Sequence, residues 1–438
     1  MSSKVKLPTA AGGESALLPK RRFPEFRNGG GWKLEPMRTA YTFGGNNSLS
    51  RDKLNYASGS VKNIHYGDVH TKFSTHFDIT KEQVPFINEA ELGSIRENSF
   101  CTEGDLIFAD ASEDLADIGK CMEIVNLNGE RIVSGLHTIL ARPNEGRIAR
   151  GFGGHLFRSS LVRRQIQKEA QGAKVQGISA KRLQNLLLAL PTSLPEQQKI
   201  AEVLGAVDEE IEKTDAIIAT TEKLKRGLMQ RLFFFKGRRY EKKIHQIAQV
   251  FGGKRLPMGY DFSPEKTEHP YIRVIDFKDS SINQIALKYI SNETSKKIKK
   301  YIITKEDIYI SIAGTVGRVG IIPAELDGAN LTENAARIVL KEKSDLVRDY
   351  IMYFLNSEAG RRQIISATVT TTQPKLALNK IEQFFIPFNS KKVDLRKTIF
   401  ILKYLDKKIM VNQKIKERMA VFKNCFTKDL LNGKRIIL

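Results

Sequence analysis

Two long stretches of the chain repeat apolar or small residues at intervals of three and four positions. In the first stretch these residues are Ile200, Leu204, Val207, Ile211, Thr214, Ile218, Thr221, Leu224, Leu228 and Leu232. In the second stretch they are Leu402, Leu405, Ile409, Asn412, Ile415, Met419, Phe422, Phe426 and Leu430. This spacing is the heptad seam of a coiled coil, so each stretch predicts a long helix with one apolar stripe.

The sequence also indicates the ends of these helices and their pairing. Pro195 and Glu196 suit a first helical turn, because proline needs no N–H partner there and a carboxylate is favoured; Asn432-Gly433 indicates the end of the second helix. Since neither helix can bury its stripe alone, we expect an antiparallel coiled coil. Its seam is expected to contain Leu204, Val207, Ile211, Ile218, Leu402, Leu405, Ile409 and Asn412, with Thr214 and Asn412 fixing the register. The alternative is two unrelated amphipathic helices, each packed on its own domain.

The chain repeats itself at a fixed distance. Arg163-Arg164-Gln165-Ile166 recurs 198 residues later as Arg361-Arg362-Gln363-Ile364. The same separation relates Leu183 to Ile381, Leu204 to Leu402, Asp208 to Asp406 and Ile211 to Ile409. Upstream the separation drifts, to 208 for Ile64 and Asp68 against Ile272 and Asp276, and to 202 for Asp105-Leu106-Ile107 against Asp307-Ile308-Tyr309. Each half therefore has a variable front and a constant back.

The fronts, about residues 32–175 and 244–372, have a mixed α/β pattern. Expected strands are Tyr271–Phe277, Ile308–Ile312 and Ala335–Leu340, and expected helices are His155–Ala170 and Arg348–Ile365. The fold class is therefore predicted as α+β, with two α/β domains in tandem, each followed by a long helix. The expected divisions are an N-terminal tail (1–24), a first domain (25–190), a central helix (191–236), a second domain (237–386) and a C-terminal helix (387–438).

Charge adds the first functional indication. The 438 residues include 71 Lys and Arg against 49 Asp and Glu, a net charge of +22, which is typical of a surface that meets a polyanion such as nucleic acid. No run of apolar residues is long enough to cross a membrane. The three cysteines form no C-x-x-C pair, and together these features predict a cytoplasmic protein.

Basic residues on the predicted loops are the candidates for DNA contact. They are Arg51, Lys53, Lys62 and Lys72 in the first domain, and Lys254, Arg255, Arg273, Lys278 and Arg318 in the second. Arginine and lysine bind phosphates, and arginine also reaches base edges in the major groove. For each of them separately, a solvated surface charge is the competing interpretation.

Motifs of catalysis and cofactor binding are absent. Ala313-Gly314-Thr315-Val316-Gly317-Arg318 lacks a Walker lysine and is interpreted as a tight turn between strands, and Gly151-Phe152-Gly153-Gly154 is weaker still as a phosphate loop. His65, His70 and His76 follow one another along one segment, but no Cys/His set has metal-finger spacing, so no metal site is predicted. We expect a chain that is not an enzyme.

The organisation resembles the DNA specificity subunits of type I restriction-modification systems. The resemblance rests on residues 17–26 (LLPKRRFPEF) with Trp32, on residues 190–201 (LPTSLPEQQKIA), and on residues 307–315 (DIYISIAGT). It implies two target recognition domains that read the halves of a split, asymmetric duplex DNA site. It also implies two methyltransferase (modification) subunits and restriction/translocase subunits as partners, and S-adenosylmethionine, ATP and Mg only in those partners.

The helices would then set the gap between the half-sites. A helix from Ile200 to Leu232 is about 50 Å long, which bounds the gap at roughly 15 base pairs. One departure from the family pattern is Pro387-Phe388-Asn389-Ser390-Lys391-Lys392-Val393, which stands where the first copy has Pro-Glu-Gln. It puts strict symmetry of the assembly in doubt.

Two other classes of function stay open at this point. A self-contained methyltransferase or nuclease would be active alone, but the chain has no Asn-Pro-Pro-Tyr-like or Asp-Pro-Pro-Tyr-like motif. A coiled-coil scaffold or RNA-binding protein would show little preference among duplex sequences.

Overall fold

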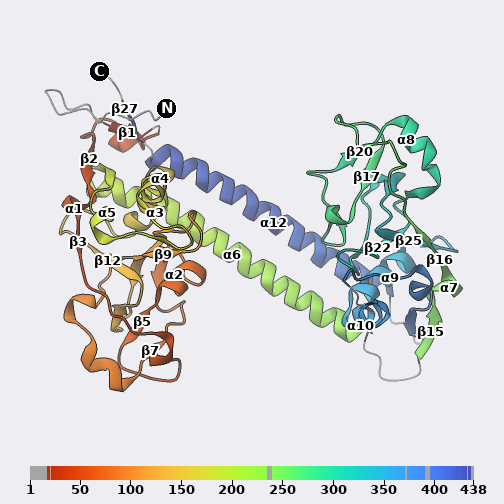
Figure 1. Cartoon of the computed structure of the whole chain (residues 1–438), viewed down its shortest axis with the longest axis horizontal. Coiled ribbons are helices and arrows are strands. Elements are labelled where there is room, and N and C mark those ends of the chain that lie inside the picture. Colours follow the sequence, from red (N-terminus) through yellow and green to blue (C-terminus); the bar gives the residue numbers. More distant parts are fainter. Residues whose placement is uncertain are drawn as a thin grey trace. The chain divides into compact units, whose positions relative to one another are not determined.

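The computed structural model describes residues 17–19, 21–233, 239–369, 372–389, 395–431 and 433–435. They fall into two compact units: unit 1 is Met1–Thr214 with Lys414–Leu438, and unit 2 is Asp215–Gln413. Two long helices, α6 (Leu194–Phe233) and α12 (Leu395–Leu431), each contribute to both units (Figure 1). The expected helix end at Asn432, the expected boundary at 236/237 and most of the expected tail lie outside the described residues.

A mainly antiparallel five-stranded sheet forms the centre of unit 1. Its strands are β3 (Tyr41–Phe43), β12 (Thr138–Pro143), β8 (Leu106–Ala109), β10 (Cys121–Asn126) and β6 (His76–Asp78), in that spatial order, and only β10 and β6 run parallel. Strand β8 is buried on both faces, because Leu106 and Phe108 face one core cluster while Ile107 and Ala109 face another. Helices α3 (Phe152–Arg158) and α4 (Ser160–Glu169) contribute to the first cluster and α2 (Tyr66–Thr71) to the second.

Smaller elements complete unit 1. One sheet joins β14 (Leu187–Pro191), β2 (Trp32–Pro36), β1 (Leu17–Pro19) and β27 (Gly433–Arg435), and another joins β11 (Ile132–Ser134), β5 (Lys62–Ile64), β7 (Phe86–Ile87) and β4 (Leu54–Asn55). Strands β9 (Ala111–Ser112) and β13 (Gln176–Gly177) pair with each other. The short helices are α1 (Met37–Ala40), α5 (Ala180–Leu183) and the 3-10 turns at Pro24–Phe26, Arg51–Lys53, Glu89–Ser94 and Glu97–Ser99.

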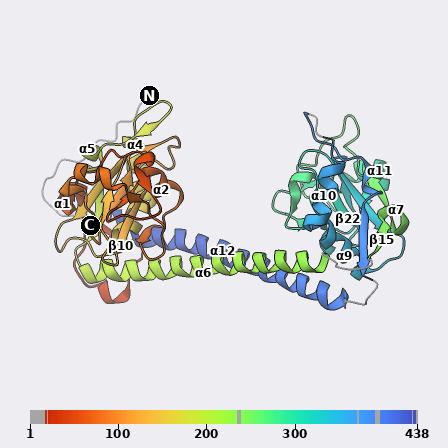
Figure 2. The same ribbon diagram turned by 90° about the horizontal axis from the view of Figure 1, so that it is seen from below.

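Unit 2 repeats this plan with two four-stranded sheets. The first runs β16 (Ala248–Gly252), β25 (Ala335–Leu340), β22 (Ile308–Ser311) and β23 (Val319–Ile321), and the second runs β20 (Lys288–Tyr289), β17 (Pro270–Ile272), β24 (Ala329–Leu331) and β21 (Ile302–Ile303). Helices α9 (Asp345–Asn356) and α10 (Glu358–Ala367) lie near β22, as Figure 2 shows. The two sheets and helices give unit 2 a mixed α/β core of its own.

The remaining elements of unit 2 are short. Strand β15 (Arg239–Lys243) pairs with β26 (Phe385–Asn389), and β18 (Phe277–Lys278) forms a hairpin with β19 (Ser281–Ile282). The helices are α7 (Ile244–Ile247), α8 (Asn292–Lys297), α11 (Leu378–Ile381) and the 3-10 turns at Val274–Asp276, Lys299–Tyr301 and Ala324–Leu326. The expected strand Tyr271–Phe277 was therefore wrong as one element, because the turn at Val274–Asp276 divides it and Asp276 caps that turn.

The constant back of each half is the same local structure. The expected helices His155–Ala170 and Arg348–Ile365 are each divided in two, because Ser159 and Ser357 adopt extended backbone angles and cap the helices that follow. In both halves a repeated glutamine then binds the backbone of a neighbouring strand at both polar groups. Gln165 bonds the C=O and N–H of Leu187 at 2.9 Å each, and Gln363 bonds those of Phe385 at 2.9 and 2.8 Å. The repeated motif thus fastens a helix to a strand.

The start of α6 is held by two buried polar side chains. Glu196 accepts hydrogen bonds from Arg22 Nε and Nη2, at 2.8 and 2.7 Å, and from Trp32 Nε1 at 3.2 Å. Gln197 donates to the carbonyl oxygens of Arg147 and Pro191. The Pro-Glu-Gln sequence therefore does more than begin a helix, since it joins the helix to the segment that contains Arg22. That part of the expected tail packs on unit 1.

Within each unit, α6 and α12 lie side by side and antiparallel, as expected (Figures 1 and 2). In unit 1, Asp208 of α6 pairs with Lys423 of α12, and Leu204 shares a core cluster with Leu430. In unit 2, Lys225 of α6 pairs with Asp406 of α12. The two aspartates are 198 residues apart, and so are the two lysines, so the repeat generates a reciprocal pair of ion pairs.

The expected seam needs correction at three places. Leu224, Ile415 and Phe422 are exposed, while Lys225 and Lys423 occupy the half-buried positions beside them. An ion pair to an aspartate on the facing helix draws each lysine inward, and its aliphatic stem covers apolar surface. Of the seam residues expected first, Leu204, Leu402 and Leu405 are buried, and Val207, Ile211, Ile218, Ile409 and Asn412 are half-buried.

The polar seam residues do not act as expected. Thr214 Oγ1 donates to the carbonyl of Glu210, and Asn412 Nδ2 donates to that of Lys408, both on their own helix at 2.8 Å. Each is therefore satisfied without a bond across the seam. The two Asp–Lys pairs do join the two helices.

Replacing Gln165 by alanine should destabilise unit 1 by about 1 to 3 kcal/mol, because the backbone of Leu187 would lose both hydrogen-bond partners. Trp32 is the only tryptophan and is buried in unit 1, so its fluorescence in urea reports this unfolding. The matched change Gln363→Ala in unit 2 should leave the Trp32 transition in place. An unchanged midpoint for Gln165→Ala would contradict the role given to the glutamine.

Candidate nucleic-acid interface

The four candidate residues of the first domain are all paired with acidic side chains. Arg51 and Lys72 converge on the buried carboxylate of Asp68, at 3.1 and 3.0 Å. Lys53 pairs with Glu91, and Lys62 pairs with Glu130, each at 2.7 Å. Pairing neutralises part of the field that a phosphate would meet.

Arg51 and Lys72 nevertheless form a small basic group with an aromatic ring. Lys72 Nζ donates to the hydroxyl of Tyr56 at 3.1 Å, and this hydrogen bond is the main cause that raises the pKa of Lys72. The Tyr56 ring is half exposed and lies 5.5 Å below the Lys72 ammonium. This is the best candidate surface in unit 1 for a nucleic-acid backbone.

In the second domain the five candidates have different surroundings. Arg255 pairs with Glu333 at 3.4 Å, and Arg273 pairs with Asp276 at 2.8 Å, at the turn that precedes β18. Lys254, Lys278 and Arg318 form no ion pair with any described residue. Lys254 lies 5.9 Å from the ring of Tyr301, and Arg318 donates to the carbonyl of Phe277 at 2.9 Å.

Lys278 and Arg318 meet at a pocket of about 590 Å³ in unit 2. Its lining comes from the β18–β19 hairpin, the turn between β22 and β23, and helices α9 and α10. The hairpin turn is Asp279-Ser280, and both residues have positive φ, 51° and 59°, a conformation that non-glycine residues seldom adopt. Ser280 can approach β23 closely because Gly320 faces its carbonyl, and a Cβ there would lie 2.3 Å away.

The glycine turn at Ala313–Arg318 forms the other wall. It connects the antiparallel strands β22 and β23, which confirms its interpretation as a tight turn. Ser311 closes it, because its Oγ donates to the carbonyl of Thr315 at 2.5 Å and accepts from the N–H of Arg318 at 2.8 Å. Gly317 has φ +86°, and a side chain there would collide with Ile364. The turn is therefore rigid and holds Arg318 at the pocket.

Arg361 is a pocket residue that we did not predict from the sequence. It lines the pocket with Lys278 and Arg318 and makes no side-chain hydrogen bond or ion pair with the described parts of the chain. Its repeat equivalent, Arg163, donates instead to the carbonyls of Ala116 and Ile118 at 2.8 and 2.7 Å, and burial lowers its pKa. One arginine of the repeat is thus structural, while the other faces an open pocket. The repeated Arg-Arg-Gln-Ile motif was the signal that could have pointed to Arg361.

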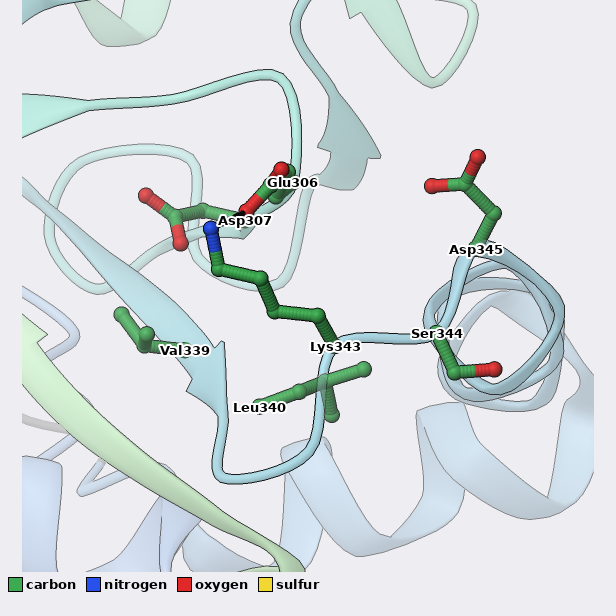
Figure 3. A pocket seen from close by; sticks show the side chains of 7 residues that line it. All are labelled: Glu306, Asp307, Val339, Leu340, Lys343, Ser344 and Asp345. Carbon is green, nitrogen blue, oxygen red and sulfur yellow. Dashed lines mark ion pairs between the residues drawn. The ribbon is translucent and has the colours of Figure 1, made fainter.

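A second pocket of unit 2, of about 300 Å³, has the opposite character. Figure 3 shows its three carboxylates, Glu306, Asp307 and Asp345, with Lys343 reaching toward the first two. Lys343 pairs with Glu306 at 2.6 Å, and Asp307 is held by Arg337 at 3.5 Å. Because three carboxylates would repel a phosphate, this pocket is a poor candidate for nucleic acid.

None of the helices within the described ranges has the length and apolar character that a bilayer crossing requires. The three histidines singled out in sequence form no common ligand group among the described residues. His70 bonds the carbonyl of Ala111, and His76 bonds that of Gly151. His76 instead lies against His155, with ring centroids 4.4 Å apart.

Comparison with known proteins agrees with this architecture. Residues 240–419 match the family model described as the type I restriction modification DNA specificity domain. Over 409 residues the chain is 25% identical to a protein of Methanocaldococcus jannaschii described as the MjaX specificity subunit of a type I restriction enzyme, with 88% of each chain covered. The MjaVIII specificity subunit of the same organism is 22% identical over 303 residues, covering 64% of this chain and 69% of that one. Residues 240–419 thus match the type I specificity domain, and the whole chain is similar to type I specificity subunits.

A solved structure supports this fold. The S subunit of a type I restriction-modification system from M. genitalium superposes with a TM-score of 0.62 at 15% identity, covering 95% of this chain and 100% of that one. At this identity the likeness concerns the fold alone. It confirms the predicted architecture of two α/β domains in tandem with long helices.

Replacing Arg361 by alanine should weaken duplex DNA binding by about tenfold and lower the slope of log K against log salt by about one. Arg163→Ala is the matched control, because the equivalent side chain bonds carbonyls inside unit 1. It should lower stability by about 1 to 3 kcal/mol and leave the salt slope unchanged. Fluorescence anisotropy at several salt concentrations measures the binding, and equal slopes for Arg361→Ala and wild type would exclude Arg361 from the interface.

Proposed function

We propose that this chain is a type I specificity subunit and that it reads a bipartite, asymmetric site on duplex DNA in the cytoplasm. The expected recognition domains, 25–190 and 237–386, would each read one half of the site. The expected tail (1–24) precedes them, and the expected helices, 191–236 and 387–438, would set the spacing. As a recognition subunit it would not be the catalytic component of its complex.

The unequal fronts support two different half-sites. In unit 2 the basic pocket formed by Lys278, Arg318 and Arg361 offers three cations without ion-pair partners in the described residues. In unit 1 the basic group is Arg51 and Lys72 around Asp68, beside the Tyr56 ring. Because these surfaces differ in shape and charge, they would recognise different base sequences.

The constant helices support a fixed gap between the half-sites. Helix α6 has 40 residues, and the seam from Ile200 to Leu232 alone is about 50 Å long. That length limits the gap to roughly 15 base pairs. The reciprocal Asp–Lys pairs would prevent the helices from sliding along each other.

The repeat also supports two copies of one partner. Ile217 and Leu224 on α6 are 42% and 59% exposed, and Ile415 and Phe422 on α12, their equivalents 198 residues later, are 42% and 53% exposed. Each couple is seven residues apart, so it lies on one face of its helix. We infer that each couple docks one methyltransferase subunit, which would bring S-adenosylmethionine. Restriction/translocase subunits would bring ATP and Mg.

The test is co-expression of the chain with a type I modification subunit encoded beside it, in a host without adenine methylation, followed by genome-wide methylation sequencing. The expected result is methyladenine confined to one two-part motif with a fixed gap. Exchange of residues 25–190 for those of a relative should change one half of the motif only. Methylation without a bipartite motif would contradict the proposal.

Other outcomes separate the alternatives. Methylation by the purified chain alone, with S-adenosylmethionine, would favour a self-contained enzyme. Failure of the two proteins to associate, with no preference among duplex sequences, would favour a scaffold or an RNA-binding protein.

The docking couples can be tested one at a time. The double variant Ile217→Glu with Leu224→Glu should reduce the bound methyltransferase subunits from two to one, and Ile415→Glu with Phe422→Glu should do the same, because each buried carboxylate loses its water. Native mass spectrometry gives the stoichiometry. Ala219→Glu, on the other flank of α6, is the control and should keep two; two bound subunits in both double variants would contradict the assignment.

A further inference from the structure

A partly buried group of two imidazoles and a carboxylate lies inside unit 1. His76 comes from β6, His155 from α3 and Asp208 from α6. One potential ligand atom from each residue lies within 4.8 Å of the other two. The three side chains thus come from three separate segments of the chain, and the fold alone brings them together.

Two atoms of this group are buried and have no hydrogen-bond partner within the described residues. They are His155 Nε2 and Asp208 Oδ2, and the His155 side chain is only 2% exposed. Buried polar atoms normally have partners, since each unmatched one costs roughly 1 to 3 kcal/mol. The other carboxylate oxygen, Asp208 Oδ1, is already paired with Lys423. The unmatched Oδ2 of Asp208 faces the His155 ring, whose Nδ1 is 4.0 Å away, so the carboxylate keeps an acceptor free beside the imidazoles.

The surroundings hold the two imidazoles in place. A carbonyl can only accept, so at 2.8 Å from Gly151 the Nε2 of His76 carries the proton and leaves the lone pair on Nδ1. A backbone carbonyl that fixes the second nitrogen in this way is the usual support of a metal-bound imidazole. Glu123, whose pKa burial raises to about 7, accepts from the N–H of Gly151 and of Gly154 and so fixes the loop that leads to His155.

The equivalent position in unit 2 shows which contacts the repeated structure makes at this place. Tyr353 lies 198 residues after His155, and its hydroxyl donates to Asp406 Oδ2 at 2.6 Å. Asp406 is the equivalent of Asp208, and its other oxygen pairs with Lys225, the equivalent of Lys423. In unit 2 the tyrosine and the lysine therefore give both carboxylate oxygens of Asp406 a partner. In unit 1 the position has an imidazole that is 4.0 Å from the carboxylate and has a second imidazole beside it.

We propose that His76, His155 and Asp208 form a binding site for one divalent transition-metal ion of the zinc type. Two imidazole nitrogens and one carboxylate oxygen are ligands that zinc favours, and a water would complete a four-coordinate site. Magnesium and calcium prefer oxygen ligands and are poor candidates. Because bonds to zinc are about 2.0 to 2.2 Å, binding draws the three side chains together by roughly 1 Å.

The protonation state of the group supports the proposal. Burial lowers the pKa of both His76 and His155, so both imidazoles are neutral at pH 7 and each has a lone pair to give. The ion would join β6 and α3 of the first recognition domain to the start of α6, all within unit 1. We expect it to be a structural staple between the recognition domain and the helix.

Isothermal titration of the tag-free chain, after treatment with a chelator, tests the site. One zinc ion should bind per chain, with a Kd of about 1 µM or tighter. Cobalt at the same site should give the visible absorption of a four-coordinate ion. Zinc should raise the melting temperature followed by Trp32 fluorescence by about 5 °C when present at a hundred times its Kd.

His155→Tyr is the decisive variant, because tyrosine is the residue that the repeat has at this place and can donate to Asp208. It should weaken zinc binding at least 100-fold and abolish the cobalt spectrum while keeping the metal-free melting temperature. His76→Gln keeps a donor for Gly151 and should weaken binding similarly. Tyr353→Phe, in unit 2, is the control and should leave zinc binding unchanged.

Three results would overturn the proposal. They are no zinc binding by the wild-type chain at 100 µM zinc, equal binding by the wild type and a folded His155→Tyr variant, and a cobalt spectrum that survives in His76→Gln. Should His155→Tyr fail to fold, the His76→Gln variant and the cobalt spectrum of the wild type still decide the question.

Discussion

The antiparallel contact between α6 and α12 is the interaction on which the rest of the molecule depends. Each helix has one apolar stripe that it cannot bury by itself, and the middle and the last third of the chain must meet before it is covered. Inside unit 1 the contact is completed by Asp208 and Lys423, and inside unit 2 by Asp406 and Lys225. These pairs are partly buried, so removing one partner would leave a charge in a poorly hydrated place. Both ion pairs can form in only one register of the two helices, so a shift along the seam would break them.

The same frame carries different chemistry in its two halves. A glutamine fastens helix to strand in both, at Leu187 and at Phe385, and this repeated contact gives each recognition domain the same foundation. Side chains that do not take part in this contact can have different roles in the two halves. Arg163 is used for local carbonyls while Arg361 faces a pocket. A repeated sequence therefore marks equal structural positions, but it does not make the functions at those positions equal.

The long helices show how charge and apolar surface divide the tasks of one element. Lys225 and Lys423 turn inward to aspartates, which leaves Leu224 and Phe422 on the outside. An exposed large apolar residue on a helix that already has a covered seam is suited to a second partner. The ion pairs thus stabilise the helix pair. Because they hold the lysines at the seam, they also leave apolar side chains on the outside of the helices.

Periodicity and repetition in the sequence determined the two long helices, their antiparallel pairing, the mixed α/β fronts and the family resemblance, because these depend on local spacing and on patterns that survive along the chain. Only the tertiary structure decided which seam positions are covered, since Leu224 and Lys225 compete for one place and the facing aspartate settles it. It also decided the breaks at Ser159 and Ser357, which a continuous apolar pattern hides. The pocket around Arg361 and the group of His76, His155 and Asp208 were beyond sequence reasoning for the same physical reason. Their members are far apart along the chain, and only the packing of the strands and helices brings them together.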